Sequence, residues 1–99
     1  MTLRPSKAIP QVRHNPDGVS FRMEDADGRR VDVFVTRMAL HELDGYTKPQ
    51  DRFAALQIFD EHRGLIEDAA VRTFEAGDYE HVGDYPAIVL RADDLQISN

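Results

Sequence analysis

The stretch from Pro49 to Ala76 carries large apolar residues at intervals of three and four positions, the spacing of one face of an α-helix. Thr47, followed three positions later by Gln50, has the residue types of an N-terminal capping box. Gly77 suits the left-handed residue that ends a helix. The pattern predicts one long amphipathic helix, whose inward residues are Phe53, Leu56, Phe59, Ile66, Ala70 and Phe74.

Two segments before this helix alternate apolar and polar residues, which is the period of a strand with one buried face. The Asp27-Gly28 pair between them is typical of a hairpin turn. Phe34 departs from the alternation, and we expect it under the N-terminal segment or at a subunit contact. The residues predicted to face the core are Val19, Phe21 and Met23 in the first strand and Val31, Val33 and Val35 in the second.

Shorter elements complete the predicted fold. Thr36 and Gly45 bracket a short helix from Arg37 to Asp44, with Thr36 as its N-cap. The apolar run Ala87–Leu90 indicates a strand that is apolar on both faces, with residues 79–82 as its candidate partner. The order β-β-α-α-β predicts an α+β domain, a small antiparallel sheet covered on one face by a short and a long helix. Apolar residues on the uncovered face make a symmetric dimer a hypothesis.

Charge is divided unevenly along the chain. The net charge is −6, yet residues 1–16 carry three basic groups and no acid, so the other 83 residues hold nine basic and eighteen acidic groups. Three prolines also interrupt this N-terminal part, and we expect residues 1–17 to form an extended or disordered basic leader before one domain, residues 18–99. Because an acidic domain repels phosphate backbones, its charge argues against nucleic-acid binding.

Several classes of protein are excluded or disfavoured. The chain has no cysteine, which rules out disulfides, thiolate catalysis and cysteine-based metal sites. No apolar run approaches the roughly 20 residues that cross a bilayer, and the N-terminus lacks the apolar stretch of a secretory signal, so we expect a cytoplasmic protein without membrane contact. The four histidines show no metal-ligand spacing, so we predict no cofactor or metal and place His14, His41, His62 and His81 at the surface.

Arg63 interrupts the inward face of the predicted long helix. An unpaired guanidinium is costly to bury, so its side chain must reach solvent or meet a carboxylate. Glu67 lies one turn further along, and Asp94 in the C-terminal turn is another candidate partner. The residue types fit a structural ion pair, an anchor for a carboxylate or phosphate ligand, or an arginine at a subunit interface.

The sequence favours a non-enzymatic role. Its many carboxylates are typical of solvated helix faces, and it has neither a nucleophile elbow nor a glycine-rich phosphate loop. The leading hypothesis is a protein-interaction module, with the homodimer as one form, that binds an unidentified protein partner through its sheet face or its leader. The alternative is a small-anion binder, or minor enzyme, in which Arg63 engages the anion and Glu67 or His62 assists. A third hypothesis is a nucleic-acid accessory factor that uses the leader alone.

The pattern Phe59-x-x-His62-Arg63-x-x-Ile66-Glu67-x-x-Ala70, followed by Phe74-Glu75-Ala76-Gly77 and a closing strand before Asp93-Asp94-Leu95, resembles domain-of-unknown-function family 1488, a family of short proteobacterial proteins. The pairs of motifs Val19-Ser20-Phe21 and Thr36-x-x-Ala39-Leu40 fit it too, so the likeness covers about residues 19–95 and leaves the leader outside. The resemblance implies a small cytosolic α+β domain without an assigned activity, cofactor or catalytic residue. Within it, Arg63 looks like part of the family pattern.

Overall fold

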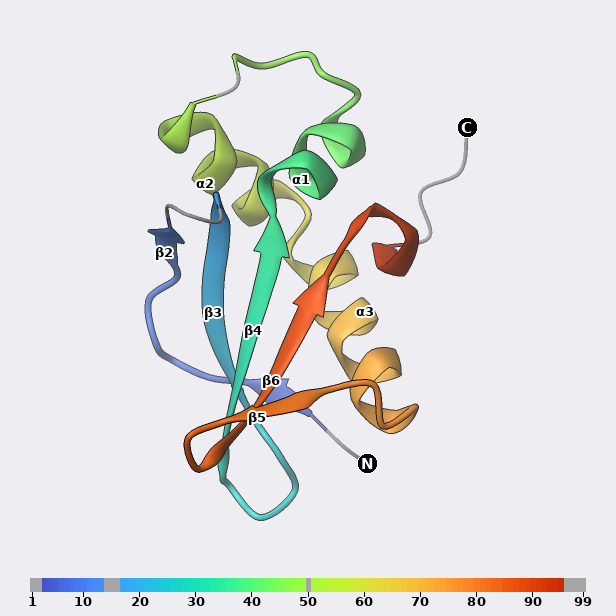
Figure 1. Cartoon of the computed structure of the whole chain (residues 1–99). Coiled ribbons are helices and arrows are strands. Elements are labelled where there is room, and N and C mark those ends of the chain that lie inside the picture. Colours follow the sequence, from blue (N-terminus) through green and yellow to red (C-terminus); the bar gives the residue numbers. More distant parts are fainter. Residues whose placement is uncertain (1–2, 14–16, 50, 96–99) are drawn as a thin grey trace.

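The computed structural model of the chain describes residues 3–13, 17–49 and 51–95. These residues form a six-stranded sheet with order β1-β3-β4-β6-β5, in which β2 also pairs with β3. Three α-helices lie together on one side of the strands (Figure 1). This arrangement confirms the predicted α+β class, and no helix among the described residues covers the other face of the sheet.

The predicted hairpin is confirmed as β3 (Gly18–Glu24) and β4 (Arg30–Thr36), which pair antiparallel. Asp25 closes the turn, because its Oδ1 atom accepts hydrogen bonds from the backbone amides of Asp27 and Arg29, both at 2.9 Å. The six residues predicted to face the core are all buried, namely Val19, Phe21, Met23, Val31, Val33 and Val35. Alternation along the two strands therefore sets which face the helices cover.

The prediction of an antiparallel sheet is wrong, because the sheet is mixed. β6 (Tyr85–Leu90) runs parallel to β4, whereas β5 (Glu80–Val82), the predicted partner strand, pairs antiparallel with β6. Between β4 and β6 the chain passes through three helices and β5, and two neighbouring parallel strands need a long connection of this kind, because the chain must return to the same end of the sheet. Strand direction is thus decided by the path of the helices, which the local sequence pattern does not report.

The described part of the leader lies along the free edge of β3. β1 (Arg4–Pro5) pairs with one end of β3, and β2 (Gln11–Arg13) pairs with the other. Leu3 is buried in the core although it precedes both strands. Residues 4–5 and 11–13 of this segment therefore belong to the sheet.

The short helix α1 (Arg37–Asp44) has the predicted bounds. The Thr36 hydroxyl accepts a hydrogen bond from the Ala39 amide at 3.1 Å, as an N-cap does. Gly45 follows in the left-handed conformation, with φ of 74°. Because both ends are specified by short-range signals, α1 was predictable from sequence.

The predicted long helix is two helices, α2 (Arg52–Glu61) and α3 (Arg63–Glu75), which meet at His62. His62 has φ of −116° and ψ of 20°, outside the helical region. Gly64, next to the break, costs about 1 kcal/mol of helix propensity relative to alanine, so the local sequence resists a bend only weakly. On either side of the break, α2 contacts β2 and β3, whereas α3 contacts β6 and β1.

Of the two predicted ends of this helical region, the C-terminal end is confirmed and the N-terminal cap is wrong. Asp51, rather than Thr47, is the N-cap of α2, because its Oδ1 atom accepts a hydrogen bond from Ala54 at 2.8 Å. Gln50, the other half of the predicted capping box, lies outside the described residues. Gly77 follows α3 with φ of 75°, in the left-handed conformation expected at a helix end.

The break changes which residues of α2 face the sheet. Ala55, Ile58 and Phe59 are buried, and the Phe59 ring lies 4.8 Å from the ring of Phe21. Phe53, predicted to face inward, is 78% exposed, because it projects from the opposite side of α2. The other predicted inward residues are buried (Ile66 and Ala70) or half-buried (Leu56 and Phe74).

Candidate functional site

Arg63 is the first residue of α3 and lies beside the helix break. Its Nε atom donates a hydrogen bond to Glu67 Oε2 at 3.1 Å, and its guanidinium carbon lies 5.4 Å from the centre of the Phe59 ring. The Arg63 side chain remains 33% exposed. Because the helix breaks here, Arg63 is no longer in the middle of a continuous buried stripe, and its charge is met by one carboxylate and one aromatic face.

Asp94 has a different partner. It lies in the 3₁₀ turn η1 (Ala92–Leu95), and its Oδ2 atom accepts a hydrogen bond from the Arg91 amide at 2.9 Å. Among the described residues, no hydrogen bond or ion pair joins Asp94 to Arg63 or Glu67. The structure therefore brings together two of the three candidate anchors and places the third at the end of β6.

One histidine is buried, contrary to prediction. His41 in α1 is 1% exposed, and neither ring nitrogen has a hydrogen-bond partner among the described residues. Its ring stacks on Tyr46 with a centroid distance of 6.2 Å. Its position directly after the buried Leu40 was the one sequence signal available. His62 is half-buried and His81 exposed, while His14 lies outside the described residues.

Across residues 3–13, 17–49 and 51–95, no three His, Asp or Glu side chains cluster in a way that would hold a metal ion. No helix in the same ranges has the length and apolarity that crossing a membrane requires.

A second charged group links α1 to α2. Lys48 Nζ lies 3.1 Å from Asp44 Oδ1 and 3.1 Å from Glu61 Oε1. Burial alone would raise the pKa of Asp44, but hydrogen bonds from the side chains and backbone amides of Thr47 and Lys48 lower this pKa to about 2. Hydrogen bonds to Glu61 and Asp44 raise the pKa of Lys48. This group explains why Thr47 does not cap α2, since Asp44 already holds it.

The sheet face opposite the helices carries a continuous set of apolar side chains, which we call the apolar strip. Cross-strand pairing places Phe34 beside Val89, and Val82 beside Tyr85. This strand carries apolar residues on both faces, as predicted: Ile88 and Leu90 are buried on the helix side, and Val89 is 42% exposed on the other. The apolar strip consists of Phe34, Val82, Tyr85, Ala87 and Val89.

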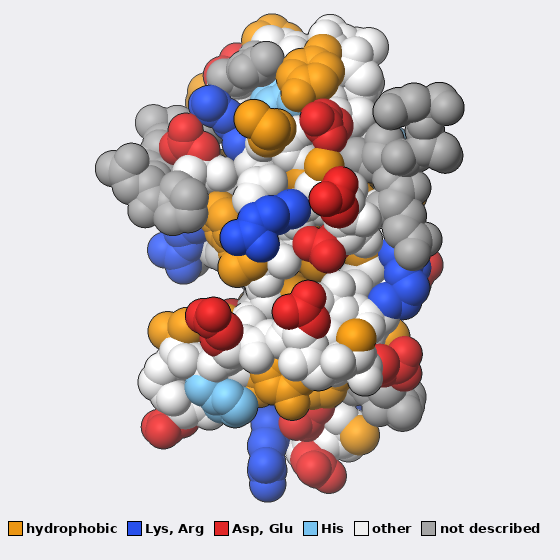
Figure 2. Space-filling view, turned by 45° about the vertical axis from the view of Figure 1, so that its right-hand side comes forward, with side chains coloured by type: hydrophobic (Ala, Val, Ile, Leu, Met, Phe, Trp, Pro, Cys, Tyr) orange, Lys and Arg blue, Asp and Glu red, His pale blue; other side chains and the backbone are white. Residues whose placement is uncertain are grey.

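Beyond one side of the apolar strip lies a groove of about 510 Å³. Apolar residues of β5 and β6 line it together with Arg91, and its acidic lining residues are Asp78, Glu80, Asp93 and Asp94. We call this surface the acidic groove. Figure 2 shows acidic side chains spread across this side of the molecule, with basic side chains among them.

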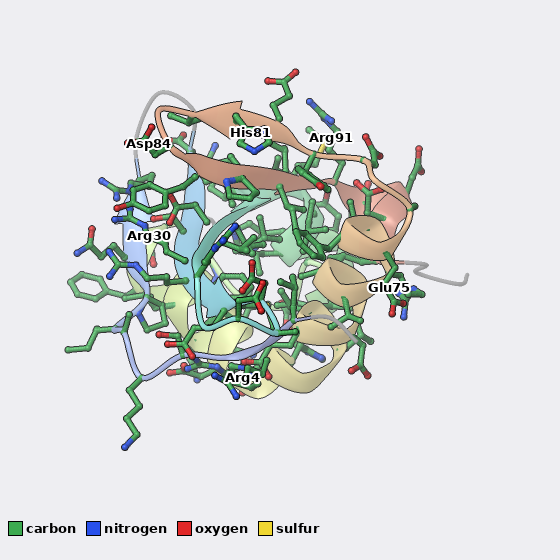
Figure 3. All side chains as sticks on the ribbon, turned by 90° about the horizontal axis from the view of Figure 1, so that it is seen from below. Arg4, Arg30, Glu75, His81, Asp84 and Arg91 are labelled. Atoms are coloured by element: carbon green, nitrogen blue, oxygen red, sulfur yellow. The ribbon has the colours of Figure 1, made fainter. Side chains whose placement is uncertain are left out.

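Beyond the other side of the apolar strip, arginines project from three neighbouring strands. Arg13 Nε donates a hydrogen bond to Ser20 Oγ at 2.8 Å, and Arg30 Nε lies 2.7 Å from Asp32 Oδ1. The hydrogen bond to Asp32 raises the pKa of Arg30, whose guanidinium carbon also lies 4.6 Å from the centre of the Tyr85 ring. We call Arg13, Arg22 and Arg30 the basic end of this face; in Figure 3, Arg30 and Arg91 lie far apart across the sheet.

A family model described as a protein of unknown function, DUF1488, matches residues 7–86. The match begins inside the leader and ends within β6, so it starts and stops earlier than the expected range of 19–95. Neither a curated protein nor a solved structure matches this chain significantly.

Proposed function

This chain belongs to domain-of-unknown-function family 1488, and from its geometry we propose that it is a non-enzymatic protein-interaction module that binds a second copy of itself through the apolar strip. The observation that carries the proposal is the exposure of neighbouring apolar side chains on the sheet face opposite the helices. Val82, Tyr85 and Val89 are 64%, 41% and 42% exposed. Contiguous apolar surface of this kind is typical of protein interfaces.

The charges beside the apolar strip favour a second copy as the partner. The basic end lies on β2, β3 and β4, whereas the acidic groove is formed around β5, β6 and η1. In a two-fold dimer the two copies use the same surface, so that a patch i of one copy contacts a patch j of the other, and patch j of the first contacts patch i of the second. When the two-fold axis runs along the strands through the middle of the apolar strip, the basic end of each copy lies over the acidic groove of the other. The face is therefore complementary to itself in charge.

The same charges disfavour a dimer formed by edge pairing. β5 is an outer strand of the sheet, and Asp78 and Glu80 lie at or beside it. Joining two β5 edges would bring these carboxylates of both copies together, and like charges repel across an interface. Face-to-face packing avoids this repulsion and covers the apolar strip at the same time.

An anion binder built on Arg63 has less support. The Arg63 guanidinium already has Glu67 as a hydrogen-bonded carboxylate and Phe59 as an aromatic neighbour. An anion would have to compete with both partners. The arginines of the basic end have fewer carboxylate partners, since Asp32 serves Arg30 alone.

Analytical ultracentrifugation over micromolar to millimolar concentrations tests the proposal. We expect a monomer–dimer equilibrium in the native chain and a dissociation constant at least about tenfold higher for Val89→Glu, because this change buries a charge in the apolar strip. Leu65→Glu is the matched control, because the exposed fraction of Leu65, 40%, is close to that of Val89, but Leu65 lies on α3. A native chain that stays monomeric throughout, or equal effects of both variants, would overturn the proposal.

A second pair of variants tests the charge argument. Glu80→Lys changes the acidic groove and should weaken dimerisation, since it places a cation opposite the basic end. Glu75→Lys makes the same change in charge at an exposed position of α3 and should leave dimerisation unaltered. The effect of Glu80→Lys should shrink as salt rises. Equal effects of the two variants would contradict the proposed orientation.

A further inference from the structure

The free edge of β3 contains a gap that opens into a small pocket. On this edge, β1 pairs with Glu24 and Met23, and β2 pairs with Gly18 to Ser20. Phe21 and Arg22 therefore have a partner strand only on the β4 side among the described residues. The connection between β1 and β2 passes this gap at Ala8 and Ile9. Together these segments enclose a pocket of about 170 Å³ on the sheet face opposite the helices.

Three cationic side chains and one anionic side chain line this pocket. Arg13 comes from β2, Arg22 from β3 and Arg30 from β4, and Asp32 is the one carboxylate among the lining residues. Asp32 lies directly opposite Arg22 in the strand pairing, yet its Oδ1 atom bonds to Arg30. The pocket therefore has a net charge of about +2 within a chain whose net charge is −6.

The donors in the pocket outnumber their partners. No side-chain hydrogen bond or ion pair within the described part of the chain involves Arg22, and that of Arg13 goes to a neutral hydroxyl, Ser20 Oγ. Gln11, which lies opposite Ser20, adds an amide to the lining. Guanidinium groups that converge on one small space suit an oxygen-rich anion, because each presents paired N–H donors in a plane.

Arginines at a sheet edge can also have a purely protective role, because charged side chains discourage edge-to-edge aggregation. It accounts for Arg22 but not for the convergence of Arg13 and Arg30 from the neighbouring strands on either side. β1 and β2 also already cover most of this edge. The arrangement is better explained by a ligand.

We propose that this pocket binds a phosphate group, either as the free ion or as part of a small phosphate ester. Arg13 and Arg22 would supply the main donors, and Arg30 would add to the positive field while it remains bonded to Asp32. The pocket volume of about 170 Å³ is enough for a phosphate group. The pocket forms within one chain, but its arginines are also the basic end that the proposed dimer places over the partner's acidic groove, so phosphate and the second copy compete for them.

Titration with inorganic phosphate, followed by the backbone amide shifts of residues 11–13, 20–22 and 30–32, tests the site at constant ionic strength. We expect saturable shifts confined to these residues in the native chain. Arg22→Gln and Arg13→Gln should each weaken binding about tenfold, the usual effect of removing a charge-assisted hydrogen bond. Arg72→Gln is the matched control, because Arg72 is an exposed arginine on α3 with no lining role.

A variant with the opposite sign separates a binding role from a structural one. Asp32→Asn removes the carboxylate that repels the anion and occupies Arg30, so phosphate affinity should rise severalfold. A purely structural pair would give no such gain. Repeating the titration with glycerol phosphate assigns the group to an ester if the ester binds more tightly, and to the free ion if it does not.

The same titration on Val89→Glu distinguishes this inference from the proposed dimer. That variant alters the apolar strip and leaves every pocket residue in place. Because loss of the dimer uncovers the basic end, phosphate binding that is equal or tighter in a chain that no longer dimerises would support the site by itself. Absence of saturable shifts in both the native chain and Val89→Glu, or equal phosphate affinities for Arg22→Gln and Arg72→Gln, would overturn it.

Discussion

The ring of Phe34 lies against Gly18 on the sheet face opposite the helices, so closely that a Cβ atom on Gly18 would stand 2.5 Å from Phe34 Cζ. The same Cβ would also meet the backbone carbonyl of Val35. Phe34 is thereby half-buried on the face where alternation predicts polar residues. The glycine explains this departure from the pattern, because it provides the space that the ring occupies.

Gly18→Ala should destabilise the fold by about 1–3 kcal/mol, the usual cost of overpacking, since the Val35 carbonyl belongs to a paired strand and yields little. Chemical denaturation at pH 7 measures the change in the free energy of unfolding. Gly64→Ala is the control, because a Cβ there meets nothing within 4 Å. It lies in α3 and should stabilise the chain by about 0.5–1 kcal/mol. The explanation fails if both variants have the same sign.

Replacing His41 with leucine should leave the free energy of unfolding unchanged or raise it by about 1 kcal/mol. The substitution removes two buried nitrogens that lack hydrogen-bond partners among the described residues and keeps a similar volume. His41→Ala should instead cost about 2–4 kcal/mol, because it leaves a cavity. His81→Leu, at an exposed position, should change stability by less than about 0.5 kcal/mol. A large loss in His41→Leu would indicate that the imidazole has a partner in the folded chain.

Asp44→Asn should lower the melting temperature at pH 7, and the difference from the native chain should disappear in acid. Hydrogen bonds hold the folded pKa of Asp44 at about 2, below its ordinary value of 3.8. A carboxylate whose pKa falls on folding stabilises the fold fully above its unfolded pKa, and that contribution is lost as the pH falls through 3.8 toward 2. Thermal unfolding followed by circular dichroism from pH 7 downward measures this convergence. Asp60→Asn, an exposed change on α2, should give a pH profile parallel to that of the native chain.

Arg63→Gln should cost no more than about 1 kcal/mol, because its pair with Glu67 is partly exposed and spans one helical turn. A double-mutant cycle with Glu67→Gln should give a coupling of about 0.3–0.5 kcal/mol, measured by chemical denaturation. Neither variant should alter phosphate binding in the pocket formed by Arg13, Arg22 and Arg30, which Arg63 and Glu67 do not line. A coupling near zero would show that the ion pair does not stabilise the helix.

Local signals were sufficient for the elements whose ends are specified by nearby residues. The hairpin follows from alternation around Asp27-Gly28, and α1 follows from Thr36 and Gly45, so both have their predicted places. The break at His62 was missed because apolar spacing continues across it and only Gly64 hints at weakness. Phe53 was misplaced for a different reason: it lies six residues before the buried Phe59 in α2, about 120° away around the helix axis, so steps of three residues had already drifted off the buried side.

The candidate surfaces depended on contacts between distant segments. Arg63 was conspicuous in the sequence only while the helix was treated as continuous, and the break gives it an ordinary partner in Glu67. Arg13, Arg22 and Arg30 carry no shared motif, and strand pairing alone brings them to one pocket.

Periodicity and capping residues by themselves determined the class of fold, the hairpin, α1 and which residues of the strands are buried, because each of these depends on neighbours within a few positions. Only the tertiary structure decided the parallel pairing of β4 with β6, the division between α2 and α3, and the grouping of charges on the face opposite the helices. The physical reason is that these features depend on the path of the chain between elements, and residues far apart in sequence leave no periodic signal when they meet.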